Sequence, residues 1–119
     1  MAIRPHKNLV VWQQAMEVVK DIYGLTHRLP KDEQFVLVAQ MRRAAISVPS
    51  NIAEGSARNS DREKVNFYTI ARGSLSELDT QVELCHDLNF IGSNDKNNVQ
   101  ERLDRVGALL NGLIESRRS

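Results

Sequence analysis

The sequence predicts an all-α protein, folded as an antiparallel up-down-up-down four-helix bundle with a proline-kinked second helix. Three observations support this prediction. Apolar residues recur at intervals of three and four in four successive segments, which is the spacing of one helix face. Short breaks rich in proline, glycine and capping residues separate these segments, so consecutive helices should run antiparallel. The alternating pattern of a β-strand is absent from the sequence.

The composition is that of one small globular domain, spanning residues 1–119. A chain of 119 residues can bury an apolar core without disulfides or metals. Cys85 is the single cysteine, so an intramolecular disulfide is excluded. The sequence shows neither a signal peptide nor a long uncharged apolar run, so we expect a bacterial cytoplasmic protein with no membrane association.

The first helix is expected at about residues 8–28. Pro30 should end it, because the residue before a proline is displaced from helical geometry. Two neighbouring apolar stripes make its face wide enough to contact two helices, or one helix and another subunit. The first stripe is Leu9, Trp12, Met16, Val19, Tyr23 and Thr26, and the second is Ala15, Val18, Ile22, Leu25 and Leu29.

The second helix is expected at about residues 32–57, with Asp32 and Glu33 favourably placed at the positive end of the helix dipole. Its predicted apolar residues are Phe35, Leu37, Val38, Met41, Ala44, Ala45, Val48 and Ile52.

A proline lies inside this second helix. Pro49 removes one backbone donor and clashes with the carbonyl of Ala45, so the helix should bend there at a cost of about 3 kcal/mol. We interpret Asn51 and Glu54, which follow the bend, as residues of a structural repair of the kink, in which the Asn51 amide can donate to a freed carbonyl group. Gly55 should end the helix or form a second weak point.

The third helix is expected at about residues 61–89. Ser60 and Glu63 have the spacing of a capping box, in which each side chain satisfies a backbone donor of the other residue. Gly73 lies in the middle of the apolar stripe, which indicates close approach of another helix near Pro49. The stripe consists of Phe67, Ala71, Ser74 or Leu75, Leu78, Val82, Cys85 and Leu88.

The fourth helix is expected at about residues 95–116, after a break at Gly92. Residues 117–119 are expected to form a frayed basic tail. The predicted core-facing residues of this helix are Val99, Leu103, Val106, Leu110 and Leu113.

Charge is unevenly distributed, although the net charge is only +1. Basic residues predominate over 40–72 and acidic residues over 73–99. The basic residues have two interpretations: they pair with carboxylates or helix ends and fix the kink or a subunit contact, or they form a phosphate-binding surface for structured RNA. The candidate nucleic-acid-binding residues are Arg42, Arg43, Arg58, Arg62, Lys64 and Arg72. Aromatic residues are few in this region, so binding should depend on backbone and shape and weaken with salt.

Residue patterns of known enzyme and cofactor sites are missing from the sequence. His6, His27 and His86 lie in different segments, and Cys85 beside His86 lacks the spacing of metal ligands. The pair of Glu-x-x-His motifs of a di-iron bundle, a phosphate loop and a dinucleotide fingerprint are also missing. We therefore expect no catalysis, no cofactor and no metal.

Several segments together resemble a known family. They are Leu9–Ala15, Leu29–Pro30 with Glu33 and Phe35, much of the block from Gln40 to Arg58, and Ile70–Leu75 with Glu77 and Leu78. With these residues the chain resembles the four-helix-bundle proteins encoded in intervening sequences of bacterial 23S ribosomal RNA. His6 departs from the aromatic residue expected before the first helix.

The resemblance implies a kinked four-helix bundle that assembles as a cyclic homopentamer, in a family without an agreed biochemical function. It also implies a relation to accessory proteins of diversity-generating retroelements, which are associated with RNA and a reverse transcriptase. We thus expect a non-catalytic homo-oligomer that binds structured RNA, a ribonucleoprotein or a nucleic-acid-processing protein. The alternative is a protein-interaction scaffold that binds no nucleic acid.

Overall fold

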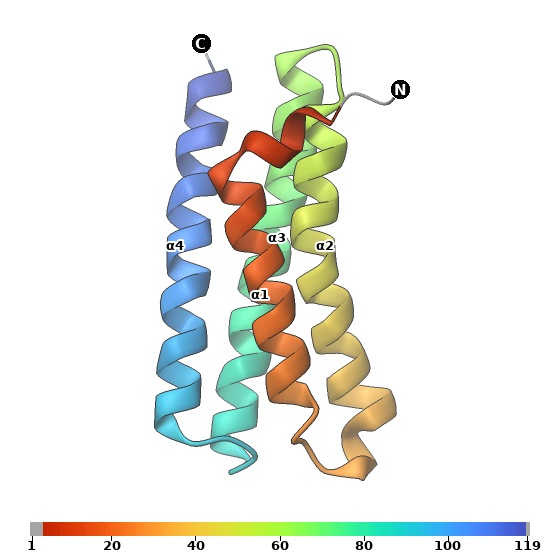
Figure 1. Cartoon of the computed structure of the whole chain (residues 1–119), viewed down its shortest axis with the longest axis vertical. Coiled ribbons are helices and arrows are strands. Elements are labelled where there is room, and N and C mark those ends of the chain that lie inside the picture. Colours follow the sequence, from red (N-terminus) through yellow and green to blue (C-terminus); the bar gives the residue numbers. More distant parts are fainter. Residues whose placement is uncertain (1–3, 119) are drawn as a thin grey trace.

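The computed structural model describes residues 4–118, and its main elements are four long α-helices (Figure 1). They are α1 (Val10–Thr26), α2 (Ala39–Ser56), α3 (Asp61–Asp87) and α4 (Ser93–Arg117). A 3-10 turn, η1 (Pro5–Asn8), precedes α1, and a 3-10 turn, η2 (Lys31–Glu33), followed by a π-helical segment, η3 (Gln34–Val38), leads into α2. Within residues 4–118 there is no β-strand, so the predicted all-α four-helix bundle is confirmed.

The helices lie side by side with consecutive helices antiparallel (Figure 1). The molecule is 44 Å long, and the described chain begins with η1 and finishes with the end of α4 at the end of the bundle where α2 turns into α3. We call this the turn end and define it as segments 4–8, 54–64 and 113–118. The opposite end carries the connections between α1 and α2 and between α3 and α4, and we define it as segments 27–34 and 83–96.

The core is one apolar cluster to which all four helices contribute. Of the two stripes expected on the first helix, the second is buried, whereas Met16 and Tyr23 of the first are 37% and 41% exposed. In α4 the buried residues follow the prediction up to Leu110, but Ile114 is buried and Leu113 only half-buried. The reason is the helical period of 3.6, which drifts away from a strict heptad over a long helix.

The burial predicted for Phe35 is wrong, since this side chain is 88% exposed. The chain passes here through η3, a π-helical segment with more residues per turn than an α-helix. An α-helical period extrapolated back from Met41 therefore assigns the wrong face to Phe35. The neighbouring Val36 is 58% exposed.

Helix α2 continues through Pro49, which is buried. Asn51 donates its amide to the Ser47 carbonyl at 2.8 Å and to the Ser47 hydroxyl at 3.0 Å. The carbonyl that Pro49 deprives of a partner belongs to Ala45, so Asn51 does not perform the repair expected of it. Because the Ser47 hydroxyl also lies 2.8 Å from that of Ser74, Asn51 instead stabilises a contact between α2 and α3.

The close approach of two helices lies at Gly55, and the prediction for Gly73 is wrong. A β-carbon at Gly55 would lie 2.7 Å from Cε1 of Tyr68 and 3.0 Å from Cβ of Phe67. A β-carbon at Gly73 would meet no atom within 4 Å, because this residue is on the exposed side of α3. Gly55 also does not end α2, which continues to Ser56.

Candidate nucleic-acid interface

The six basic residues predicted to bind nucleic acid do not form one surface. Arg42 lies between α1 and α2, where its Nε donates to the Thr26 hydroxyl at 3.0 Å. Its guanidinium carbon lies 4.4 Å from the centre of the Tyr23 ring, a cation–π contact. Arg42 is therefore a structural link between two helices.

Arg72 and Arg43 are also separated from the rest. Arg72 lies between α3 and α4 and donates to the Asn111 side-chain oxygen at 3.1 Å. Arg43 is exposed on α2, and no carboxylate in residues 4–118 pairs with it.

The remaining three residues gather at the turn end. Arg58 pairs with Glu54 at 2.9 Å, and its guanidinium carbon lies 4.7 Å from the centre of the Phe67 ring. Lys64 donates to the carbonyl of Ser56 at 3.1 Å. Arg62 is exposed and pairs with no carboxylate of the described chain. Thus Arg58 and Lys64 help to fold the turn, while the charge of Arg62 is free.

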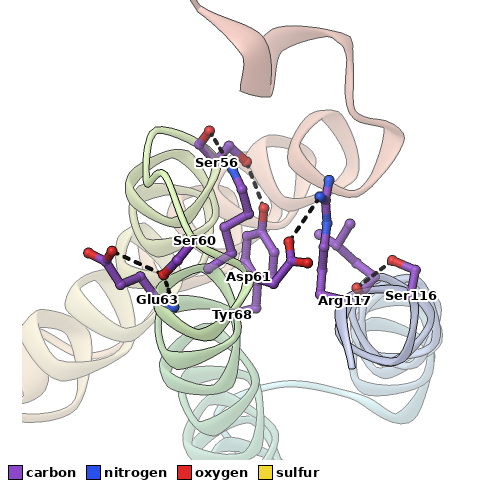
Figure 2. A network of polar contacts seen from close by, with 9 residues as sticks. Ser56, Ser60, Asp61, Glu63, Tyr68, Ser116 and Arg117 are labelled. Atoms are coloured by element: carbon purple, nitrogen blue, oxygen red, sulfur yellow. Dashed lines mark hydrogen bonds and ion pairs between the residues drawn. The ribbon is translucent and has the colours of Figure 1, made fainter. Parts of the chain in front are cut away.

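The turn between α2 and α3 is held by a helix cap (Figure 2). The Ser60 hydroxyl accepts a hydrogen bond from the backbone N–H of Glu63 at 3.2 Å, which confirms the predicted cap. In a full capping box the Glu63 carboxylate would accept from the backbone N–H of Ser60. Here it accepts instead from the Ser60 hydroxyl, at 3.0 Å. The cap fixes where α3 begins and hence where Arg62 lies.

Tyr68 fastens the end of α2 to α3. Its ring is buried, and its hydroxyl lies 3.0 Å from the hydroxyl of Ser56 (Figure 2). Lys64 bonds the backbone carbonyl of the same serine. Two side chains of α3 therefore hold the last turn of α2, and the basic residues of the turn are carried on a firmly packed support.

Arg117 is a fourth basic residue of this surface that the sequence analysis did not find. Helix α4 continues to Arg117, where a frayed tail was expected, and Arg117 pairs with Asp61 at 3.3 Å (Figure 2). The signal that could have found it is topological. In an antiparallel bundle the end of the fourth helix lies beside the start of the third.

A group of possible metal ligands lies at the opposite end. Ligand atoms of Glu83, His86 and Asp87 are all within 4.8 Å of one another. Hydrogen bonds from Gln100 at 3.0 Å and from Lys96 hold the pKa of Glu83 below its usual range. Because Glu83 already has cationic and amide partners, the group is better described as an ion-pair network. The sequence analysis missed it because it considered histidine and cysteine spacing and the paired motifs of a di-iron site, whereas Glu83 and His86 form one isolated Glu-x-x-His motif.

A surface groove of about 630 Å³ lies between α1 and α4. Its charged walls pair with each other: Arg102 lies 2.7 Å from Asp21, and Arg28 lies 3.1 Å from Asp95. Two of its three arginines are therefore neutralised by ion pairs, so the groove does not present a row of free cations to an anion.

No helix within residues 4–118 combines the length and apolar character needed to cross a lipid bilayer.

Comparisons with known proteins agree with this architecture. A solved structure of a protein with unknown function from the S23 ribosomal protein family of Bacteroides thetaiotaomicron VPI-5482 superposes with a TM-score of 0.82 at 24% sequence identity, covering 88% of this chain and 98% of that one. No curated protein matches the chain. The sequence model of the 23S rRNA-intervening sequence protein family matches residues 7–112. The chain therefore belongs to the 23S rRNA-intervening sequence protein family.

Proposed function

We propose that this protein is a non-catalytic homo-oligomeric bundle that binds structured RNA, alone or in a ribonucleoprotein, through the basic surface at its turn end. The observation that carries the proposal is the convergence of Arg58, Arg62, Lys64 and Arg117 from both sides of one turn and from the end of α4.

The basic side chains of this surface can bind phosphate groups with little loss of folding stability. Arg62 has no carboxylate partner within the described chain. Arg58 and Arg117 pair with Glu54 and Asp61, but both pairs are exposed, and such pairs contribute about 0–1 kcal/mol. An RNA phosphate can therefore replace the carboxylate with little loss of stability. Contacts of this kind give affinity that falls steeply with salt.

Exposed apolar residues support self-association. Met16 and Tyr23 lie seven residues apart on α1, and Ile70 and Leu84 lie fourteen apart on α3, so each pair lies on one face of its helix. These side chains are 37–51% exposed. The pair on α1 and the pair on α3 are different surfaces. If the α1 pair of one copy contacts the α3 pair of the next copy, the contact is head-to-tail, and repeated contacts of this kind can close into a ring, as expected for a pentamer.

The test is fluorescence anisotropy of a labelled RNA hairpin, titrated with protein of known native mass at about 50 and 200 mM salt. We expect binding by an oligomer, with affinity at least tenfold lower at the higher salt. A parallel titration with the variant Arg58→Ala/Arg62→Ala/Lys64→Ala should show weaker binding and a smaller salt slope.

Absence of binding at the lower salt would refute the RNA proposal. The second candidate, a protein-interaction scaffold, is favoured by the exposed apolar residues named above together with Phe35 and Val36. In that case the native mass should still be that of an oligomer, and the variant Met16→Ser/Tyr23→Ser should reduce it.

A further inference from the structure

The basic character of the turn end extends beyond the turn to both terminal segments of the chain. Arg4 and Lys7 lie on or beside η1, and Arg118 follows α4, at the same end of the molecule as the α2–α3 turn (Figure 1). The turn end as defined above carries seven basic and four acidic residues, whereas the opposite end carries three basic and five acidic residues. The bundle thus has a charge polarity along its 44 Å axis.

Side chains, and not helix dipoles, determine this polarity. The turn end receives the starts of α1 and α3 and the ends of α2 and α4, so the partial charges of the helix termini oppose one another. The excess of lysine and arginine at the turn end is therefore not offset by the backbone.

Three of the basic side chains at this end are exposed and have no carboxylate partner within residues 4–118: Arg4, Lys7 and Arg62. Arg118 lies 3.7 Å from Glu115 in a pair that is largely exposed. These charges come from separate parts of the chain, which the bundle topology brings to one face. A phosphate backbone crossing the end of the bundle would meet them together.

The aromatic residues in the turn end and next to it are not available for stacking on unpaired bases. Tyr68 is 1% exposed, and one face of Phe67 is covered by the guanidinium of Arg58. His6 is engaged in an edge contact with Trp12, with ring centres 5.0 Å apart. Proteins that bind single strands use exposed aromatic platforms, whereas double-helical RNA, with its bases already stacked, is bound through its phosphates and sugars.

From the charge polarity, the free cations and the occupied aromatic rings, we infer that the whole turn end is one RNA face and that its ligand is the phosphate backbone of double-helical RNA. This inference rests on the proposed function and specifies its surface and substrate class. Arg42, Arg43 and Arg72, although predicted from the sequence, lie outside this face.

Two matched variants test the inference. The end variant is Arg4→Gln/Lys7→Gln/Arg62→Gln, and the control variant is Arg43→Gln/Arg105→Gln/Lys31→Gln. Each removes two arginines and one lysine that are exposed and that pair with no carboxylate of the described chain, so both change the net charge equally. Binding is measured by anisotropy with a labelled RNA hairpin and with a labelled oligouridine of the same length, over a range of salt concentrations, after circular dichroism has verified that both variants are folded.

We expect the end variant to bind the hairpin about tenfold or more weakly, with a salt slope smaller by about 2 to 3, and the control variant to stay near the parent. We also expect the parent to prefer the hairpin to oligouridine. Equal losses of hairpin affinity in both variants would refute the assignment of the RNA surface to the turn end while leaving RNA binding intact. Equal affinity of the parent for the hairpin and for oligouridine would refute the assignment of double-helical RNA as the ligand. A parent that binds neither RNA would refute the proposed function itself.

Discussion

Replacing Gly55 with alanine tests how closely α2 approaches α3. In an exposed helix interior, alanine stabilises a helix by about 1 kcal/mol relative to glycine. At Gly55 the added methyl would lie 2.7 Å from one carbon of the Tyr68 ring and 3.0 Å from a second. This ring has little freedom to move, because it is 1% exposed and its hydroxyl is bonded to Ser56.

The steric penalty should exceed the gain in helix propensity. Overpacking of a filled core costs about 1–3 kcal/mol, and the upper part of this range applies here, since the third contact, at 3.0 Å, is to Cβ of Phe67, which moves only with its backbone. After the gain of about 1 kcal/mol is subtracted, Gly55→Ala should destabilise the protein by about 1–2 kcal/mol. For a chain of this size the melting temperature should fall by about 4–8 °C.

The matched control is Gly73→Ala, because a methyl there meets no atom within 4 Å. This variant should be more stable than the parent by up to about 1 kcal/mol. Both are measured by urea unfolding followed by circular dichroism, together with thermal melts. If Gly55→Ala were as stabilising as Gly73→Ala, the close packing of the two helices at Gly55 would be refuted.

Three further predictions concern single side chains. Arg42→Ala should lower the free energy of unfolding by about 1–2 kcal/mol, because it removes the hydrogen bond to Thr26 and the contact with Tyr23; hairpin affinity should not change, and a stable variant with weakened RNA binding would contradict the structural role. Ser60→Ala should lower the free energy of unfolding, measured with urea, by about 1 kcal/mol, whereas Ser60→Asp should retain most of the helix cap. An equal loss of unfolding free energy in both variants would argue against capping by Ser60. Burial raises the pKa of the Cys85 thiol to about 11, with a smaller contribution from Glu33, so the folded state favours the neutral thiol. The stabilisation from this pKa shift should be fully present below pH 9 and lost as the pH rises through about 11. The difference in unfolding free energy between the parent and Cys85→Ala should therefore narrow over that pH range. A difference that stays constant would refute the pKa shift.

Local sequence signals predicted local structure well. The start of α3 at Asp61 agrees with the prediction because a cap depends on residues three apart in the chain. The π-helical segment before α2 was not predicted, because a single wide turn leaves no periodic signal, and Phe35 was consequently assigned to the core. The roles of the two glycines were assigned wrongly because the sequence does not determine which face of a helix meets its neighbour at a given residue.

The candidate surface was harder to predict for a related reason. Arg42, Arg58 and Arg72 are close in sequence, but their positions on the helices direct them to three different parts of the bundle. Conversely, Lys7 in η1 and Arg117 at the end of α4 are far apart in sequence, but these two elements meet at the same end of the bundle. Composition counted along the chain therefore identified a basic segment, whereas the surface depends on how the helices are arranged.

The location of η1 and of the end of α4 beside the α2–α3 turn has a practical consequence for protein engineering. An affinity tag, a fluorophore or a fused domain attached before η1 or after α4 would lie at the turn end and would compete with a ligand of that surface for access. The connection between α3 and α4 lies at the other end of the long axis, and Asn89 and Gly92 are exposed there. Joining the start of η1 to the end of α4 by a linker and opening the chain at this connection would give a circularly permuted protein whose attachment points lie far from the proposed RNA face.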